Sequence, residues 1–211
     1  MNRDGTMALF QYWNRLRGSR LAPRRTEIEP ADIKGLLADT FILERGMRGE
    51  PVFRLAGTRI CATYGKELRG LVFPSLWAAR DQALVSRLVS QALEESTVAV
   101  ITFEGKSRDG RLNRFELLIL PLDGGREGAR ALGTIQPFMK PYWLGADPIV
   151  ENRVESFRML DPDREAPFVS LRHGMPVPPL SPSKQELSAR LDGFGRRIRH
   201  LVVLQGGRRD P

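Results

Sequence analysis

The sequence predicts an α+β domain built on a five-stranded antiparallel sheet. Two apolar segments, at 40–46 and 52–60, are joined by a short turn that contains glycine. Three more segments with strand character follow at 97–105, 112–122 and 131–138, and the interval between the two groups has helical periodicity. Hairpin-linked strands separated by helices are typical of antiparallel α+β sheets rather than of doubly wound parallel ones.

An amphipathic helix is predicted at the start of the chain, at about residues 6–17. Its apolar stripe, in which side chains repeat at spacings of three and four, consists of Leu9, Tyr12, Trp13 and Leu16. Pro30 then favours the first turn of a short helix, because its missing N–H would have had no partner inside the helix.

The stretch after the second predicted strand, FRLAGTRICATYGKELRGLVF at 53–73, has three glycines around a tyrosine. Gly57, Gly65 and Gly70 would let the backbone turn sharply, so we expect short helices here. The following segment keeps helical periodicity up to about residue 95. It predicts either one helix or a short turn and a long helix, with a break near Asp81.

The predicted strand at 112–122 is apolar on both of its faces. Its segment FELLILPL, at 115–122, does not alternate between apolar and polar residues, which is typical of a strand that is covered on both sides. The helices at 73–95 can cover one face. The other face then requires the N-terminal helix, a second subunit or another partner.

The chain divides into three predicted parts. Residues 1–26 form the N-terminal helix and a linker, residues 27–145 form the domain, and residues 146–211 form a proline-rich, basic and largely irregular tail. Within that tail, 161–185 is expected to be an extended linker and 186–205 a weak helix, because two glycines disfavour helix there.

The basic excess of the chain raises the question of nucleic-acid binding. The formal net charge is +8, and arginines gather towards both ends. Basic tails attract phosphates through counterion release, but the sequence has no helix-turn-helix, zinc-finger or RNA-recognition motif and few aromatic residues among the arginines. A solvated basic surface is the preferred interpretation, and a nucleic-acid-binding protein is a secondary alternative.

Metal and catalytic chemistry are not predicted. Cys61 is the only cysteine, and His173 and His200 are the only histidines, so no metal site is expected. No phosphate-binding loop or nucleophile elbow is present, and we expect no enzymatic activity. The apolar runs are shorter than the ~20 residues of a membrane span, so a cytoplasmic location is expected.

Several segments together resemble the single-domain PAS-like proteins of alphaproteobacteria. They are YWNRLRGSRLAPRRTEIEPADIKGLL, FRLAGTRICATYGKELRG, LWAARDQ, FELLILPL and PYWLG, and the resemblance covers about residues 9–145. One departure is Glu27 and Glu29, where the family tends to have aspartates. The resemblance implies a PAS sensory fold, in which short helices after the second strand cover the open side of the sheet.

The resemblance also implies where a ligand would lie. Ligand-binding PAS domains hold their ligand between the short helices and the sheet, and the candidate pocket here consists of Phe41, Leu43, Phe53, Leu55, Ile60, Tyr64, Phe73, Ile101, Leu118 and Leu120. The alternative is that these side chains simply fill the interior. No cofactor is expected, because both histidines lie beyond the resemblance and Cys61 lacks the sequence context of a flavin photosensor; an unknown small ligand stays open.

The function implied is that of a signalling adaptor or regulator that acts through protein contacts, such as contacts with kinases or cell-cycle factors. The predicted homodimer or partner surface is the helical stripe Leu9, Tyr12, Trp13 and Leu16, because exposed apolar patches mark interaction sites. The alternative is that this helix packs on its own sheet and the chain is monomeric. A small-molecule sensor is the alternative function.

Overall fold

The computed structural model describes residues 1, 3–124 and 128–163, and the backbone of residues 196–198 and 201–203. The chain divides into two compact units, Met1–Ala166 and Pro167–Pro211, and each is considered by itself. No helix in the described residues is long and apolar enough to cross a membrane.

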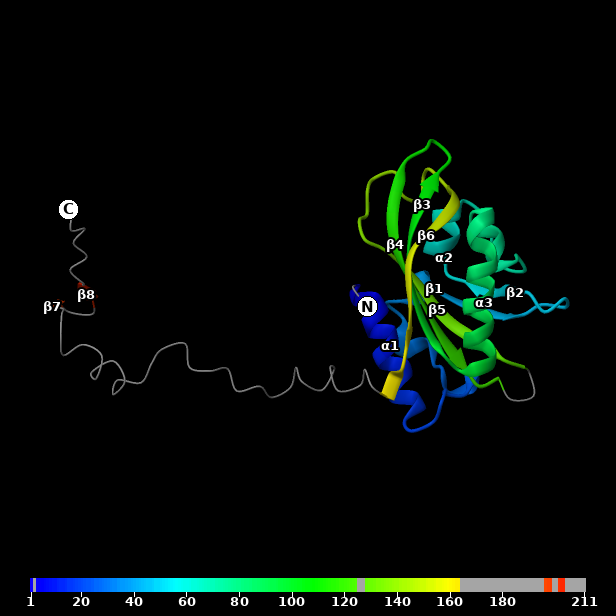
Figure 1. The fold of residues 1–211 in the computed structure, drawn as a ribbon, viewed down its shortest axis with the longest axis horizontal. Helices are drawn as coiled ribbons and strands as arrows, with labels where there is room; N and C mark the ends of the chain where they lie inside the picture. Colours follow the sequence, from blue (N-terminus) through cyan, green and yellow to red (C-terminus); the bar gives the residue numbers. More distant parts are fainter. Residues whose placement is uncertain (2, 125–127, 164–195, 199–200, 204–211) are drawn as a thin grey trace, which may run out of the picture. The chain divides into compact units, whose positions relative to one another are not determined.

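The first unit is built on an antiparallel sheet, with six strands in the described residues (Figure 1). The strands are β1 (Thr40–Arg45), β2 (Pro51–Ala56), β3 (Val98–Ser107), β4 (Leu112–Leu122), β5 (Arg130–Pro137) and β6 (Ile149–Leu160). They lie in the order β2-β1-β5-β4-β3-β6, and every neighbouring pair is antiparallel. The α+β class and the antiparallel sheet are therefore confirmed, with six strands in place of the predicted five.

Strand β4 is buried on both faces, as its sequence predicted. Every residue from Phe115 to Leu122 is buried, and β4 is hydrogen-bonded to β3 on one edge and to β5 on the other. Leu117 and Ile119 belong to the core cluster on one face of the sheet, whereas Leu118 belongs to the cluster on the opposite face. The sheet therefore separates two apolar layers.

The first layer lies between the sheet and the helices from the middle of the chain. These are α2 (Thr58–Tyr64), the 3₁₀ helix η4 (Phe73–Leu76) and α3 (Ala79–Glu95). Helix α3 packs against β3, β4 and β5 through the apolar side chains Val85, Leu88, Val89 and Ala92. The expected break before the long helix is present, but it lies at Trp77–Ala78 rather than near Asp81.

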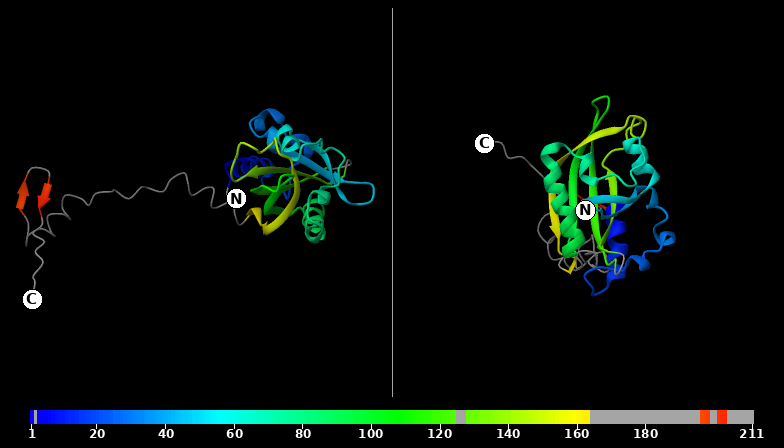
Figure 2. Two further views of the ribbon diagram at one scale, coloured as in Figure 1. Left: turned by 90° about the horizontal axis from the view of Figure 1, so that it is seen from above. Right: turned by 90° about the vertical axis from the view of Figure 1, so that its right-hand side faces the viewer.

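The second layer lies under helix α1 (Asp4–Arg17), on the other side of the sheet from α3 (Figures 1 and 2). The short 3₁₀ helices η1 (Arg25–Glu27), η2 (Pro30–Ile33) and η3 (Leu37–Asp39) follow it. Leu9, Phe10 and Trp13 are at most 1% exposed. They pack in one cluster with apolar residues of the sheet, namely Ile42, Val98, Val100, Leu118, Leu120 and Leu132.

The predicted partner surface on α1 is wrong. Leu9, Tyr12 and Trp13 are buried within this chain and Leu16 is partly buried against the same cluster, so the stripe offers no free apolar face. The cause is the apolar outer face of the sheet, which α1 covers. The indole Nε1 of Trp13 also donates a hydrogen bond of 2.7 Å to the Pro121 carbonyl oxygen of β4.

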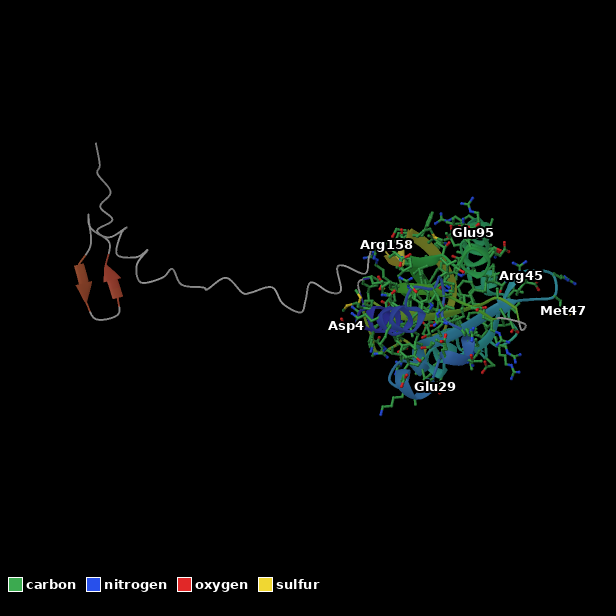
Figure 3. All side chains as sticks on the ribbon, turned by 90° about the horizontal axis from the view of Figure 1, so that it is seen from below. Asp4, Glu29, Arg45, Met47, Glu95 and Arg158 are labelled. Atoms are coloured by element: carbon green, nitrogen blue, oxygen red, sulfur yellow. The ribbon has the colours of Figure 1, made fainter. Side chains whose placement is uncertain are left out.

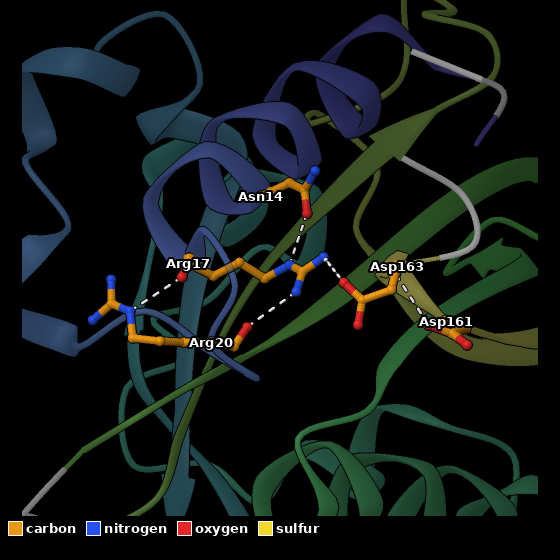
Figure 4. Close-up of polar contacts among 5 residues, drawn as sticks. All are labelled: Asn14, Arg17, Arg20, Asp161 and Asp163. Carbon is orange, nitrogen blue, oxygen red and sulfur yellow. Dashed lines mark hydrogen bonds and ion pairs between the residues drawn. The ribbon is translucent and has the colours of Figure 1, made fainter. Parts of the chain in front are cut away.

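A buried arginine fixes the end of α1 (Figure 4). Arg17 is 4% exposed; its guanidinium donates to Asn14 Oδ1 at 2.7 Å, to the Arg20 carbonyl oxygen at 3.0 Å and to Asp163 Oδ1 at 2.7 Å. It also lies 5.5 Å from the ring centroid of Trp13, within the range of a cation–π contact. The end of α1 is thereby tied to the chain that follows β6.

Strand β6 and the domain boundaries correct the predicted organisation. The predicted domain at 27–145 excluded both α1 and β6, yet both belong to the compact unit Met1–Ala166. The sequence of β6 is rich in charged residues, which is common on edge strands. This charged pattern did not predict a strand, although β6 pairs with β3. Ala78 and the first turn of α3 cover part of its outer edge, because Ala78 N–H donates to the Asn152 carbonyl at 2.8 Å and Val154 N–H to Asp81 Oδ2 at 3.0 Å.

The second predicted strand, at 52–60, is shorter than expected. Strand β2 ends at Ala56 and helix α2 begins at Thr58. Gly57 makes the turn: its N–H donates to the Thr40 carbonyl at 2.8 Å, and a Cβ at this position would collide with the carbonyl oxygens of Leu37 and Ala38. The expected short helix with glycine turns is confirmed in this stretch.

The described part of the second unit contains two short antiparallel strands, β7 (Arg196–Ile198) and β8 (Leu201–Val203). These residues were predicted to belong to a weak helix at 186–205, and that prediction is wrong for them. The remainder of that helix, and residues 164–185 of the predicted linker, lie outside the described residues.

We predict that Trp13→Ala lowers the free energy of unfolding by about 3–5 kcal/mol, because it opens a cavity in the second layer and removes the hydrogen bond to Pro121. Chemical denaturation followed by circular dichroism measures the change. The control is Tyr142→Ala, at a side chain that is 91% exposed, with an expected cost below about 0.5 kcal/mol. Equal costs for the two variants would contradict the docked position of α1.

Candidate functional site

The space between the sheet and helix α3 is filled by a chain of aromatic rings. Neighbouring ring centroids are 4.9–6.1 Å apart, within the range of favourable aromatic contacts. The chain consists of Phe41, Phe53, Phe73, Trp77, Phe103 and Phe115. The interior in which a PAS ligand was expected is therefore closely packed.

Seven of the ten residues predicted to line a pocket belong to this core. They are Phe41, Leu43, Phe53, Ile60, Tyr64, Phe73 and Ile101. The other three lie elsewhere. Leu118 and Leu120 face α1 in the opposite layer, because successive side chains of a strand point to opposite faces. Since β4 is apolar on both faces, its sequence does not indicate which residues face α3 and which face α1. Leu55 is half exposed, at 50%.

Tyr64 links α2 to β6 inside the core. Its side chain is buried, and its hydroxyl accepts a hydrogen bond of 2.9 Å from Asn152 Nδ2. Burial raises the pKa of Tyr64 above its ordinary value, so the phenol stays protonated at neutral pH. Its environment is that of a structural anchor.

A pocket of about 250 Å³ opens beside α2, and we call it the α2 pocket. Helix α2 supplies one wall, β4 and β5 supply another, and the loop at 140–145 lines a third side. Ile60 and Tyr64, from the predicted set, line it. The other apolar lining side chains include Ala62, Phe115, Ile135, Pro137 and Leu144.

Charged groups lie in the same α2 pocket. Arg59 forms an ion pair with the largely buried carboxylate of Asp39, and both residues line the pocket together with the exposed Lys140. No acidic group in the described part of the chain forms an ion pair with Lys140. The pocket thus combines an apolar wall with two cations and one carboxylate.

A second hollow of about 550 Å³ is lined by four arginines, and we call it the arginine groove. Its residues are Arg25 of η1, Arg54 of β2, Arg69 of the loop after α2 and Arg130 of β5, together with Ile42, Leu55, Ala56 and Glu67. Glu44 lies nearby, with Oε2 at 3.8 Å from Arg54 Nε and 3.7 Å from Arg130 Nε.

Sequence reasoning missed the arginine groove. Its four arginines come from segments far apart in the chain, and no spacing rule connects them. One local cause is a β-bulge: Ile42 pairs with Leu55 and Leu43 with Phe53, so Arg54 is the extra residue. Bulges redirect side chains and break regular alternation, which a strand pattern does not reveal.

Side chains of the kinds that bind metals are scattered in the described residues. No group of three or more histidine, cysteine, aspartate or glutamate side chains gathers there as a metal site would require. Cys61 is partly buried, its Sγ lies 3.9 Å from the Ala56 carbonyl oxygen, and burial raises the pKa of its thiol. His173 and His200 lie outside the described residues. The absence of a cofactor stays a prediction.

A comparison with protein-family models supports the PAS part of the resemblance seen in the sequence. A protein-family model described as "PAS domain" matches residues 1–136. The crystal structure of the PAS domain of a protein from Colwellia psychrerythraea is similar, with 16% sequence identity and a TM-score of 0.39, over 54% of this chain and 100% of that chain. No curated protein matches the sequence.

Proposed function

We propose a function from the premise that this chain belongs to the PAS domain family, whose model covers residues 1–136. Membership of this family indicates a signalling or sensory role. Within that role, our proposal is that the domain acts through protein contacts, as an adaptor or regulator of a signalling pathway. A kinase is one class of partner that fits such a role, and a cytoplasmic location remains our prediction.

The packed interior is the observation that supports contacts at the surface. Aromatic rings fill the space between the sheet and α3, while α1 covers the other face of the sheet. A partner protein would therefore bind to grooves and edges at the surface of this domain. A partner contact on α1 is disfavoured, because its apolar stripe is buried.

We expect the full chain, tagged and expressed in its own cell of origin, to retain at least one specific protein partner, identified by mass spectrometry. A chain ending at Asp163 should retain the same partner, because it keeps β6 and the Asp163–Arg17 ion pair. The matched control is an unrelated tagged protein of similar positive charge.

Two outcomes would count against this proposal. Retention of no protein beyond those bound by the basic control would remove the adaptor role. Retention by the full chain but not by the chain ending at Asp163 would assign the contact to the C-terminal unit instead of the PAS domain.

A second candidate function is the sensing of a small molecule, and the α2 pocket is the observation that favours it. Its volume of about 250 Å³ lies just below the range of about 300–1,000 Å³ that is usual for drug-sized ligands, so a smaller ligand fits. The apolar wall together with Arg59 and Lys140 favours a molecule with an apolar body and one acidic group.

Ala62 and Gly145 both line the α2 pocket and lie close to each other, which makes a steric test possible. A Cβ built at Gly145 would lie 4.0 Å from the Cβ of Ala62. Ala62 is exposed at the rim, and replacing alanine by leucine in a helix costs little in helix propensity. A larger side chain at position 62 would therefore obstruct the pocket without opening the core.

We predict that octanoate binds the full chain, that 1-octanol binds at least about threefold more weakly because it lacks the charge, and that Ala62→Leu abolishes binding. Isothermal titration calorimetry provides the measurement. Ala83→Leu, the same change at an exposed position of α3, should leave the affinity unchanged. Octanoate binding that survives Ala62→Leu, or no binding to the wild type, would exclude the α2 pocket as a site for this class of ligand.

A further inference from the structure

We infer that the arginine groove binds an acidic peptide segment of a partner protein, in which an apolar side chain lies among the carboxylates. This inference rests on the proposed function, because it names the surface and the partner chemistry of the same protein contact. It follows from the charge of the groove, its apolar floor and the way in which its residues are held.

The charge of the groove favours carboxylates. Among the described residues, four guanidinium groups line it, against one lining carboxylate, that of Glu67, and the neighbouring Glu44. In the described part of the chain, no carboxylate forms an ion pair with the side chain of Arg25 or of Arg69. Because a guanidinium presents a planar pair of donors that matches a carboxylate, these two arginines are the strongest candidates for contacts with a partner.

The floor of the groove favours an apolar side chain between the acids. Leu55 is 50% exposed and lies with Ile42 and Ala56 among the arginines. A partner side chain that covered Leu55 would remove apolar surface from water, with a gain of about 25 cal/mol per Å² buried. An evenly charged polyanion would leave this surface uncovered.

A peptide fits the groove better than a nucleic acid does. Proteins that bind single strands combine cations with aromatic rings on which the bases stack, and none of the described residues that line this groove is aromatic. Glu67 and Glu44 add negative charge inside and beside it, which opposes a continuous row of phosphates. Separate carboxylates on a peptide can instead be placed opposite individual arginines.

The groove is held in shape by backbone contacts. The Arg25 N–H donates to the Asp123 carbonyl at 3.0 Å. The loop that carries Arg69 is joined to β2, because Gly70 N–H donates to the Phe53 carbonyl at 2.7 Å and Phe53 N–H to the Leu71 carbonyl at 3.0 Å. A site whose backbone is already ordered loses less entropy on binding.

The test uses fluorescence anisotropy of labelled probes with the full chain. The probes are the peptide GDEDLEDEG, the same peptide with serine in place of leucine, and a single-stranded oligo(dT) of about the same net charge. We expect the leucine peptide to bind most tightly, the serine peptide at least about threefold more weakly because it cannot cover Leu55, and binding to weaken as salt screens the charges.

Two double variants with equal changes in charge test the location. Arg25→Gln/Arg69→Gln should weaken peptide binding about fivefold to tenfold, since each exposed ion pair contributes up to about 1 kcal/mol. The control, Arg87→Gln/Arg158→Gln, changes exposed arginines of α3 and β6 and should change affinity less than about twofold. Figure 3 shows Arg158 on the opposite side of the view from Arg45 and Met47 of the β1–β2 hairpin. Matching circular dichroism spectra confirm that both variants fold.

Three outcomes would overturn the inference: equal weakening by the two double variants, equal affinity for the leucine and serine peptides, or tighter binding of oligo(dT) than of either peptide at the same salt concentration. Failure of the proposed function looks different, because the wild-type chain then retains no specific protein from its own cell. If the wild type and Arg25→Gln/Arg69→Gln retain the same partner equally well, the groove inference fails and the adaptor role stands.

Discussion

The burial of strand β4 on both of its faces is the constraint on which the rest of the structure depends. All residues from Phe115 to Leu122 are buried, and exposing either face of this strand to water would be costly. One face requires the helices from the middle of the chain, and the other requires α1. Because the chain supplies both covers itself, neither face of β4 is free to act as a docking surface.

Local periodicity predicted much of this fold, since helices and strands with a strong apolar pattern carry their own signal. It predicted the stripe on α1, the long helix and the two-sided burial of β4. It could not predict whether Leu118 faces α1 or α3, because both faces of β4 are equally apolar. Strand β6 was missed because its exposed, charged positions resemble a polar loop. The arginine groove could not be predicted from the sequence, because Arg25 and Arg130 are far apart in the chain and come together only in the folded domain.

Because the core is filled and both faces of β4 are covered, the hollows considered for binding lie at the periphery of the domain. Two of the hollows in the described part of the chain differ in chemistry. The α2 pocket is mainly apolar and is also lined by the cations of Arg59 and Lys140, whereas the arginine groove is basic with a small apolar floor. Arg17 adds a structural link, because it ties the end of α1 to Asp163.

Hydrogen–deuterium exchange of the full chain tests the two-sided cover of β4 most directly. If α1 and β4 belong to one cooperative unit, their slowest amides should exchange at rates within about tenfold of each other, because both open only when the domain unfolds. Peptide-resolved mass spectrometry can compare residues 8–17 with 115–122. Exchange of α1 at the rate of an unstructured peptide, while β4 stays protected, would contradict the account.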